Sequence, residues 1–442
     1  MAAATLSLSS PSPRSSSWIS SILDQHRPAL GPYEELYRHL HQHGELSTQE
    51  KETAALMASQ LRKISDSFDI RTGIGGHGLV AILDNGPGTT ILLRADMDAL
   101  PVQEKTGLEY ASTKRMRDDT DGLEKPVMHA CGHDFHMTAL LAAAETLVSA
   151  RTAWSGRIVF LFQPAEERGS GAQAMVDDGL YDAGRHACPI PDVVLGQHVL
   201  PLRAGTTATR AGSLMSAADS FRITIYGRGG HGSMPHRTID PVVVASHVVV
   251  RLQTIVAREV PPSETAVVTV GALQAGSAEN VIPDEAVLKI NIRTVSALWR
   301  DRVLAAVQRI VRAECLAANC PRDPSFEPTS SFPLTVNHAA VAHSINDAFT
   351  AYFGDAHDPN VPNALGSEDF GILATAVDRP YCFWFFGGVD QVAFDEAVAR
   401  GDEATIPVNH SPFFAPVLQP TLTTGINALV VAALTYLGTG GR

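Results

Sequence analysis

Residues 157–167 read RIVFLFQPAEE, and this stretch decides the fold that the sequence predicts. The run 157–162 is mostly Ile, Val, Leu and Phe, which is typical of a strand buried on both faces of a sheet. It is followed at once by a proline turn and two acids, Glu166 and Glu167. Parallel sheets gather their functional side chains at the carboxyl ends of their strands, so this pattern predicts a parallel sheet with a ligand-binding edge.

Other apolar runs resemble this one and are likewise bounded by turn-forming residues. Helical patterns over 50–64 and 138–150 lie between them. Strands that alternate with helices predict an α/β fold, a mostly parallel sheet flanked by helices. The further predicted strands cover 78–83, 90–93, 193–196 and 381–386.

The chain has 442 residues, more than one core of roughly 250 to 300 residues usually holds, so we expect a second domain. The composition changes around 211–220 and again at 325–336, where Pro, Ser and Thr collect. Between these points the predicted order is strand, helix, strand, strand, helix, with Asp240 as helix N-cap, which indicates a small α+β sandwich. We therefore expect a disordered tail over 1–17, a catalytic metal-binding domain over 18–212 and 331–442, and an inserted lid or dimerisation domain over 213–330.

The charge balance argues against nucleic acid and anionic membrane as partners, because 34 basic residues face 47 acidic ones, a net charge of −13. No apolar run approaches the roughly 18 residues of a membrane span. The five cysteines are few and odd in number, which favours a reducing compartment and cytoplasmic residence. A small-molecule substrate is the remaining expectation.

Polar clusters follow the predicted strands, and their residue types point to a metal. Thiolate, imidazole and carboxylate together are the ligands of zinc and similar ions, whereas magnesium and calcium sites use oxygen almost exclusively. Glu166 and Glu167 in extended backbone would point opposite ways, so one can bind metal while the other acts as a base. The clusters are Arg94-Ala-Asp96-Met-Asp98, His129-Ala-Cys131-Gly-His133-Asp134-Phe-His136, Gln163-Pro-Ala-Glu166-Glu167, Gly196-Gln197-His198 and Asn409-His410-Ser-Pro412.

Several other motifs have simpler interpretations. The glycine pattern at 227–232 matches a dinucleotide fingerprint, but no acid follows at the required distance, which excludes nicotinamide binding. His39, His41 and His43 are expected on a helix surface. Cys315 and Cys320 could form a second metal site but lack nearby histidines. For the loop 367–369, Ser-Glu-Asp, a substrate or supporting role stays open.

These motifs in this order resemble the dinuclear metal amidohydrolases that include hippurate hydrolases, bacterial aminoacylases and plant auxin-amide-conjugate hydrolases, with a zinc-peptidase-like fold. The likeness runs from about Tyr37 to Pro412. It implies that Glu166 is the catalytic base. It also implies that two divalent metal ions, Zn²⁺ or Mn²⁺, are held by Cys131, His133, Glu167, His198 and His410.

One departure concerns Asp96-Met-Asp98, where relatives in the wider superfamily carry His-x-Asp with a ligand His. The resemblance makes Asp98 the orienting carboxylate and leaves Asp96 uncertain, and the thiolate ligand favours zinc. In the inserted domain, the glycine loop resembles one that supplies a His to the oxyanion, which is His231 here. Asn280 and Arg293 are the expected substrate-binding residues, with Arg293 holding a carboxylate.

The resemblance implies hydrolysis of the amide bond of N-acyl amino acids. The alternative is a dipeptidase or carboxypeptidase with the same two metals, which would need an acidic pocket for a free ammonium group. A noncatalytic binding protein is disfavoured, because Glu166 and all five ligand candidates are present. Relatives commonly dimerise through the lid, so we expect a homodimer, and whether His231 serves its own site or its partner's stays open.

Overall fold

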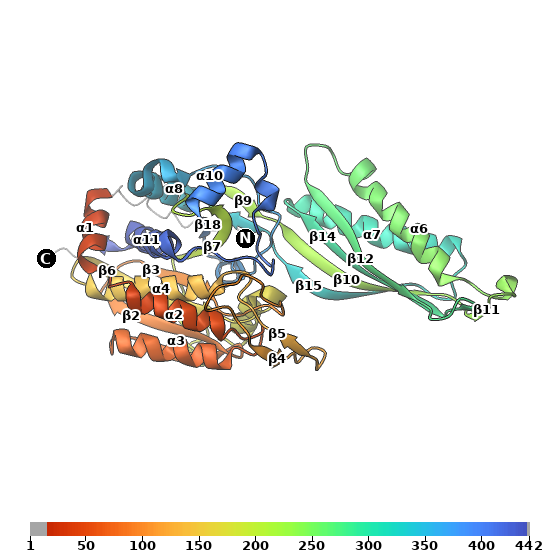
Figure 1. The fold of residues 1–442 in the computed structure, drawn as a ribbon, viewed down its shortest axis with the longest axis horizontal. Helices are drawn as coiled ribbons and strands as arrows, with labels where there is room; N and C mark the ends of the chain where they lie inside the picture. The colour runs from red at the N-terminus through yellow and green to blue at the C-terminus, as the bar shows by residue number, and fades with distance from the viewer. Residues whose placement is uncertain (1–15, 440–442) are drawn as a thin grey trace, which may run out of the picture. The chain divides into compact units, whose positions relative to one another are not determined.

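The computed structural model describes residues 16–439, which form two compact units (Figure 1). Unit 1 comprises Met1–Gly212, Val336–Val361 and Asp369–Arg442, and unit 2 comprises Ser213–Thr335 and Pro362–Glu368. The tail expected over 1–17 lies outside the described residues except for Ser16 and Ser17, which begin helix α1.

Within residues 16–439, unit 1 contains a nine-stranded sheet in the order β1-β2-β6-β3-β7-β18-β8-β17, with β19 paired to β6. The central strands β6, β3, β7 and β18 run parallel, and antiparallel strands flank them. The predicted α/β arrangement is therefore confirmed. The strands are β1 Asp69–Ile74, β2 Gly78–Asn85, β3 Thr90–Asp96, β6 Trp154–Gln163, β7 Val193–Arg203, β8 Thr207–Ala208, β17 His357–Asp358, β18 Tyr381–Val389 and β19 Gly438–Thr439.

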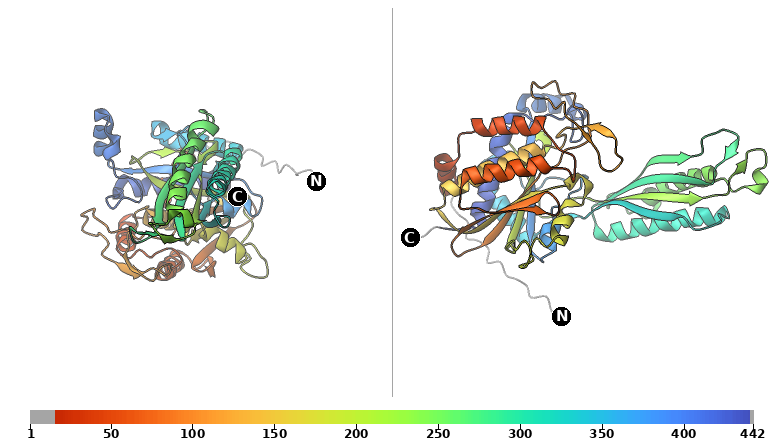
Figure 2. Two further views of the ribbon diagram at one scale, coloured as in Figure 1. Left: turned by 90° about the vertical axis from the view of Figure 1, so that its right-hand side faces the viewer. Right: turned by 90° about the horizontal axis from the view of Figure 1, so that it is seen from below.

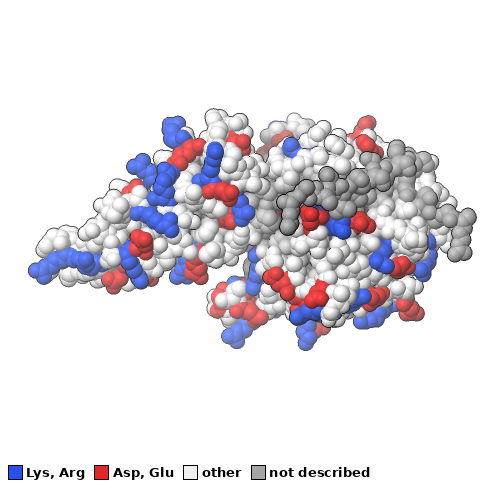
Figure 3. All heavy atoms as spheres, turned by 180° about the vertical axis from the view of Figure 1, so that it is seen from behind, with Lys and Arg blue, Asp and Glu red and all other residues white. Residues whose placement is uncertain are grey.

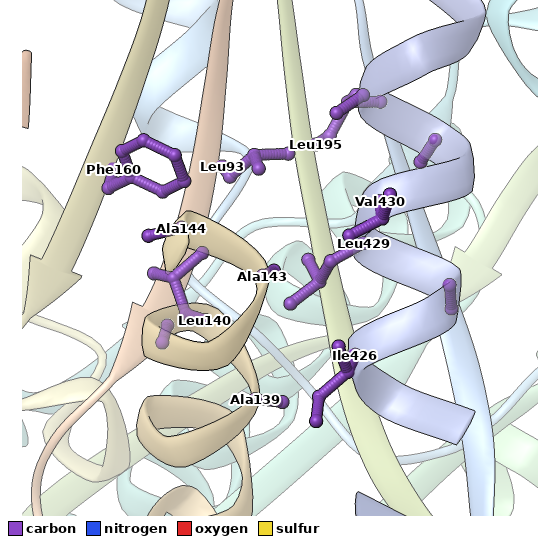
Figure 4. Close-up of a cluster of buried hydrophobic side chains, with 14 of the residues drawn as sticks. Leu93, Ala139, Leu140, Ala143, Ala144, Phe160, Leu195, Ile426, Leu429 and Val430 are labelled. Atoms are coloured by element: carbon purple, nitrogen blue, oxygen red, sulfur yellow. The ribbon is translucent and has the colours of Figure 1, made fainter. Parts of the chain in front are cut away.

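Helices cover both faces of this sheet and explain why its strands are apolar throughout. On one face, α4 (His133–Ser149) and α11 (Leu418–Tyr436) pack against β3, β6 and β7 (Figure 4). Ala139, Ala143 and Ala144 let α4 approach closely, while Leu93 and Phe160 fill the space between (Figure 4). On the other face, α5 contacts β6 and α9 contacts β7.

Further helices complete the layers of unit 1, with α2 and α3 packed beside α4 (Figure 2). Helix α4 begins at His133, before the predicted start at 138, so a metal-ligand candidate is its first residue. The remaining elements of unit 1 are α1 Ser16–His26, α2 Gly31–Gln42, α3 Lys51–Ile64, β4 Arg115–Arg117, β5 Glu124–Pro126, α5 Gly171–Asp177, β16 Thr335–Asn337, α8 Ala339–Phe353, α9 Ile372–Thr375 and α10 Gln391–Arg400.

Unit 2 is a four-stranded antiparallel sheet, in the order β12-β14-β10-β15, covered by helices α6 and α7. Asp240 caps α6 as predicted, accepting a hydrogen bond of 2.9 Å from the Val242 amide. The placement of a boundary at 325–336 missed edge strand β15, in which Pro328 pairs with Phe221 next to an irregularity in the register. The elements are β9 Gly212–Met215, β10 Ala217–Tyr226, β11 Gly230–His231, α6 Pro241–Thr254, β12 Ala266–Ala275, β13 Val281–Ile282, β14 Glu285–Thr294, α7 Ala297–Ala317 and β15 Ser325–Phe332.

The absence of a membrane span stays a prediction. By length and composition alone, Pro241–Glu259 and Leu418–Tyr436 could each cross a membrane. The second is 78% buried, as expected for a core helix of a soluble protein. Both basic and acidic side chains occur on each unit on the face shown in Figure 3.

Candidate active site

The carboxyl ends of β3, β6 and β7 meet at one edge of the unit 1 sheet, and the predicted metal ligands converge there. The ligand atoms of Cys131, Glu167 and His410 lie within 4.8 Å of one another, and so do those of His133, Glu166 and Glu167. Glu167 belongs to both groups. His133 and His198 meet again in a third group with ligand atoms equally close together. The structure thus brings all five ligand candidates and the expected base into one cluster.

A tight glycine turn places two of these side chains. Gly132 has a φ of +83°, and a Cβ there would lie 2.3 Å from Val199 Cγ1, so only glycine fits. The turn presents Cys131 on one side and begins α4 with His133 on the other. Cys131 Sγ lies 3.4 Å from His198 Nε2, close enough for both to contact one ion.

His198 is held in the form that binds metal. Its Nδ1 donates a hydrogen bond of 2.7 Å to the Val199 carbonyl, which leaves the Nε2 lone pair facing Cys131. Burial holds the pKa of His198 well below its usual range, and the neighbouring His136 lowers it further. The imidazole is therefore neutral at physiological pH, as ligation requires.

The buried polar atoms of the cluster fit a cation. Both ring nitrogens of His133 and Oε1 of Glu167 are buried without a hydrogen-bond partner among the described residues, and His133 Nε2 lies 3.8 Å from that oxygen. Buried polar atoms of native proteins are rarely left unpaired. Burial raises the pKa of the Cys131 thiol well above its ordinary value, and Glu167 and Glu166 raise it further. A divalent cation would pair one ring nitrogen of His133 and the Glu167 oxygen, and it would stabilise the Cys131 thiolate.

The pKa of His133 also reflects the negative charge of the surrounding carboxylates. Burial lowers the pKa of its imidazole, but Asp96 and Asp98 outweigh burial and raise it to about 10. The surrounding carboxylates therefore favour positive charge at this ring, and a bound metal ion would supply it in place of a proton. His133 Nδ1 lies 3.3 Å from an Asp98 oxygen, outside hydrogen-bond geometry.

The expectation that Glu166 and Glu167 lie in extended backbone is wrong. They begin a 3₁₀ turn, Glu166–Arg168, which follows Ala165 in the left-handed region at a φ of +49°. The turn points both carboxylates toward the same imidazole, with oxygens 3.9 Å and 3.8 Å from His133 Nε2. Their different environments, not opposite directions, must then separate their roles.

The two aspartates of Asp96-Met-Asp98 support other site residues. Asp98 accepts hydrogen bonds from the amides of Glu166 and Glu167, at 3.1 Å and 3.0 Å. Asp96 accepts one of 2.5 Å from His136 Nδ1, and His136 Nε2 in turn accepts the Val199 amide at 2.9 Å. The sequence interpretation gave His136 no role; its position in the helix three residues after His133 was the available signal.

Two further expectations, for the 367–369 loop and for His41, change with the structure. In the 367–369 loop, Asp369 accepts a hydrogen bond of 2.6 Å from Gln163 Nε2 in unit 1, whereas Ser367 lies 3.4 Å from Arg293 in unit 2. The surface assignment of His41 is wrong. Its ring is buried between Asp134 (2.7 Å) and Glu104 (3.1 Å).

His410 completes the cluster from its exposed side. Its side chain is 56% exposed, and its Nε2 lies 3.2 Å from Glu167 Oε2. The backbone is left-handed here too, at a φ of +70°, and its amide donates 2.8 Å to the Ala130 carbonyl. Strained non-glycine positions are common where a structure fixes functional side chains.

The predicted residues of unit 2 fall into two places. His231 and Asn280 are neighbours, because β11 pairs with β13 and the Gly232 amide donates 2.8 Å to the Asn280 carbonyl. Arg293 lies near the far end of β14, where its Nη1 donates 2.6 Å to the Leu365 carbonyl.

Comparisons with known proteins agree with this site. The pattern of Peptidase family M20/M25/M40 matches residues 92–406. The chain is 39% identical to N-acetyl-L-cysteine deacetylase of Bacillus subtilis over 79% of each chain, and 35% identical to hippurate hydrolase of Campylobacter jejuni over 80% of this chain and 88% of that one.

Among solved structures, a Bacillus subtilis protein described as a dinuclear metal binding peptidase from the M20 family matches with a TM-score of 0.69 at 26% identity. The match covers 95% of this chain and 98% of that one. The convergence of thiol, imidazole and carboxylate groups at one sheet edge and these similarities lead to one assignment. The chain belongs to Peptidase family M20/M25/M40 and is a metal-dependent hydrolase of amide bonds.

Proposed function

We propose that this enzyme hydrolyses the amide bond of N-acyl amino acids at a site with two divalent metal ions, Zn²⁺ or Mn²⁺. The observation that supports this most strongly is the cluster of ligand candidates, in which Glu167 shares one group with Cys131 and His410 and another with His133. Oε1 of Glu167 is buried without a hydrogen-bond partner among the described residues. The ligands in this proposal are Cys131, His133, Glu167, His198 and His410.

Glu166 acts as the general base. When bound, two such cations lower the pKa of water and polarise the amide carbonyl. Glu166 takes the proton from the attacking water and delivers it to the departing amine nitrogen, while Asp98 fixes the Glu166 amide at 3.1 Å. The 3.9 Å between Glu166 and His133 Nε2 supports this role, because it keeps the base beside the ligands.

His231 donates to the developing oxyanion. Its Nδ1 accepts hydrogen bonds from the Ser233 amide, at 3.1 Å, and from the Ser233 hydroxyl, at 2.8 Å. An Nδ1 that accepts an amide proton carries no proton itself, so in the neutral ring the proton resides on Nε2. The imidazole is thereby set as an outward-facing donor, the form that an oxyanion requires.

Arg293 anchors the substrate carboxylate, and it lies far along unit 2 from His231 and Asn280. Glu285 and Arg293 are eight positions apart along β14, roughly 27 Å at about 3.4 Å per residue, and His231 lies beyond the Glu285 end. An N-acyl amino acid is far shorter than that. The separation supports a homodimer in which the Arg293 of one subunit and the His231 of the other serve one substrate.

The test is a substrate panel assayed with added Zn²⁺ or Mn²⁺. N-acyl amino acids such as hippurate should be cleaved, while their methyl esters, which lack the carboxylate for Arg293, should be cleaved much more slowly. Equal rates on acid and ester would contradict the anchoring. A preference for dipeptides with a free amino group would favour the dipeptidase alternative instead. Cytoplasmic residence is part of the proposal and is supported by five free cysteines.

A further inference from the structure

Three consecutive backbone amides in the loop that carries Glu166 and Glu167 point at two buried carboxyl groups. The Ala165 amide donates 2.7 Å to Oε1 of Glu50, and the next two amides donate to Asp98. Glu50 lies 115 residues earlier in the chain and is fully buried. Nothing in the sequence interpretation gave Glu50 a role.

Glu50 joins two left-handed turns through one oxygen. Its Oε1 also accepts the Thr48 amide at 2.9 Å, and both donors have unusual backbone, with φ of +71° at Thr48 and +49° at Ala165. Neither residue is a glycine, so each conformation is strained and persists only where the surroundings impose it. The shared acceptor is one such constraint.

The Ala165 turn is held from its other side as well. The Ala165 carbonyl accepts the Gly171 amide at 3.1 Å, and a Cβ on Gly171 would lie 1.5 Å from the Pro164 carbonyl oxygen. On the Glu50 side, Ser47 donates 2.6 Å to Asp98, so both carboxyl groups belong to one frame. Within residues 165–167, the Glu50 side chain accepts the amide of Ala165, whereas Asp98 accepts the next two amides.

We propose that Glu50 is a positioning residue, which holds Ala165 in its left-handed turn and thereby sets Glu166 and Glu167 in place for proton transfer and metal binding. The inference rests on the proposed function, in which these two glutamates are base and ligand. Glu50 acts through the position of one acceptor oxygen, since its Oε2 is buried without a hydrogen-bond partner among the described residues.

We therefore expect glutamine at position 50 to keep the positioning role of Glu50, and aspartate to lose it. Burial raises the pKa of Glu50 to about 8, and the charge of Asp98 contributes, so the group resembles a neutral amide at neutral pH. Glutamine keeps an acceptor oxygen at the same reach. Aspartate keeps the carboxyl group but is one methylene shorter, which withdraws the oxygen from the Ala165 amide.

Glu45 provides a matched control from the same loop. It is also buried, and one of its oxygens also accepts two hydrogen bonds, from the amide and hydroxyl of Thr53 at 2.7 Å and 2.8 Å. These bonds tie the loop to α3 and not to Ala165. Glu45→Ala should thus cost stability as Glu50→Ala does, without moving the catalytic glutamates.

The experiment compares Glu50→Gln, Glu50→Asp, Glu50→Ala and Glu45→Ala by turnover per folded, metal-loaded subunit, and by metal affinity in competition with a chelator. We expect Glu50→Ala and Glu50→Asp to lose roughly 10- to 100-fold in kcat with a smaller change in KM, and to bind one equivalent of Zn²⁺ roughly 10-fold more weakly. Glu50→Gln and Glu45→Ala should stay within a few-fold of the wild type on both measures.

The opposite order would overturn the proposal. It fails if Glu50→Asp is as active as Glu50→Gln, because the reach of the acceptor oxygen would then not matter, or if Glu45→Ala matches Glu50→Ala. Should Glu50→Ala not fold, the Gln and Asp pair still decides. If wild-type protein cleaves no N-acyl amino acid, the proposed function fails by itself, and the Zn²⁺ affinities still test Glu50.

Discussion

The metal edge of unit 1 and the β11–β13 tip of unit 2 carry their functional residues in opposite ways. His133 and Asp98 are almost fully buried, and several hydrogen bonds from distant elements fix their surroundings. His231 is exposed, and the hydrogen bonds that its side chain makes within the described residues come from Ser233, two residues away. The contrast teaches that metal binding needs a preformed, low-dielectric frame, whereas an oxyanion donor needs only the right tautomer on a segment that can meet the substrate.

Metal removal tests the buried side of the comparison most strongly. We expect chelation to abolish hydrolysis and readdition of Zn²⁺ or Mn²⁺ to restore it, with close to two ions per chain, because five ligand candidates exceed one tetrahedral site with an open position. Elemental analysis and activity before and after dialysis measure this. Full activity in verified metal-free protein would remove the metals from the reaction.

The adjacent glutamates should separate into a base and a ligand. Glu166→Gln should keep both metals and lower kcat by roughly 10² to 10⁴, the range of a general base, while Glu167→Gln should lose metal. The two variants are matched, since each changes one carboxylate of the same turn near His133. Metal content in the reverse order would mean that the two roles are exchanged.

His231→Ala tests the exposed tip. It should keep both metals and bind substrate nearly normally, but lose about 2.7 to 4 kcal/mol of transition-state stabilisation, roughly 10² to 10³ in kcat, as expected for one oxyanion donor. The control is Asn280→Ala, a change at the same tip that should affect KM more than kcat. Unchanged turnover in His231→Ala would exclude it from the mechanism.

Mixing subunits shows which chain His231 serves. If it acts in the partner's site, inactive Glu166→Gln and His231→Ala proteins should recover part of the activity together, because one site of the heterodimer has both groups intact. If subunit exchange is verified and no activity is recovered, His231 serves the site of its own chain. That result would contradict the shared site that we infer from the separation of Arg293 and His231 along unit 2.

The sequence predicted the cluster because the carboxyl ends of parallel strands meet, so motifs after β3, β6 and β7 had to converge. It could not predict how Glu166 and Glu167 are aimed. That depends on a left-handed alanine, which no local propensity favours, and on a carboxyl group 115 residues away. Strand β15 was missed because Pro328 is compatible only with an edge or bulge position.

His41 shows a signal that was available and misread. His39 and His43 are four positions apart and stack at 4.2 Å between ring centroids on the outer side of α2. His41 lies four positions after Tyr37, a buried residue of the same helix, so the helical period places it on the inner side. Reading the three histidines by helix phase, rather than as one cluster, separates them correctly.

The smallest expected effect concerns the contribution of the buried His41 to folding stability. Its ring contacts Asp134 and Glu104 and none of the five ligand candidates. Burial lowers the pKa of its imidazole, but Asp134 and Glu104 outweigh burial and raise it to about 9. A raised pKa means that the folded protein binds the proton more tightly than the unfolded chain. The stabilisation is therefore complete below a pH of about 6.5 and is lost as the pH rises through 9, at most roughly 3 kcal/mol.

Denaturant unfolding of wild type and His41→Gln from pH 6 to pH 10 measures this contribution. The difference in unfolding free energy should be largest near pH 6 and should narrow toward pH 10, because only the wild type carries the buried imidazolium between Asp134 and Glu104. His39→Gln, the same change on the exposed side of α2, should show no such narrowing. A gap between wild type and His41→Gln that stays constant with pH would mean that His41 stabilises the frame by packing and not by charge.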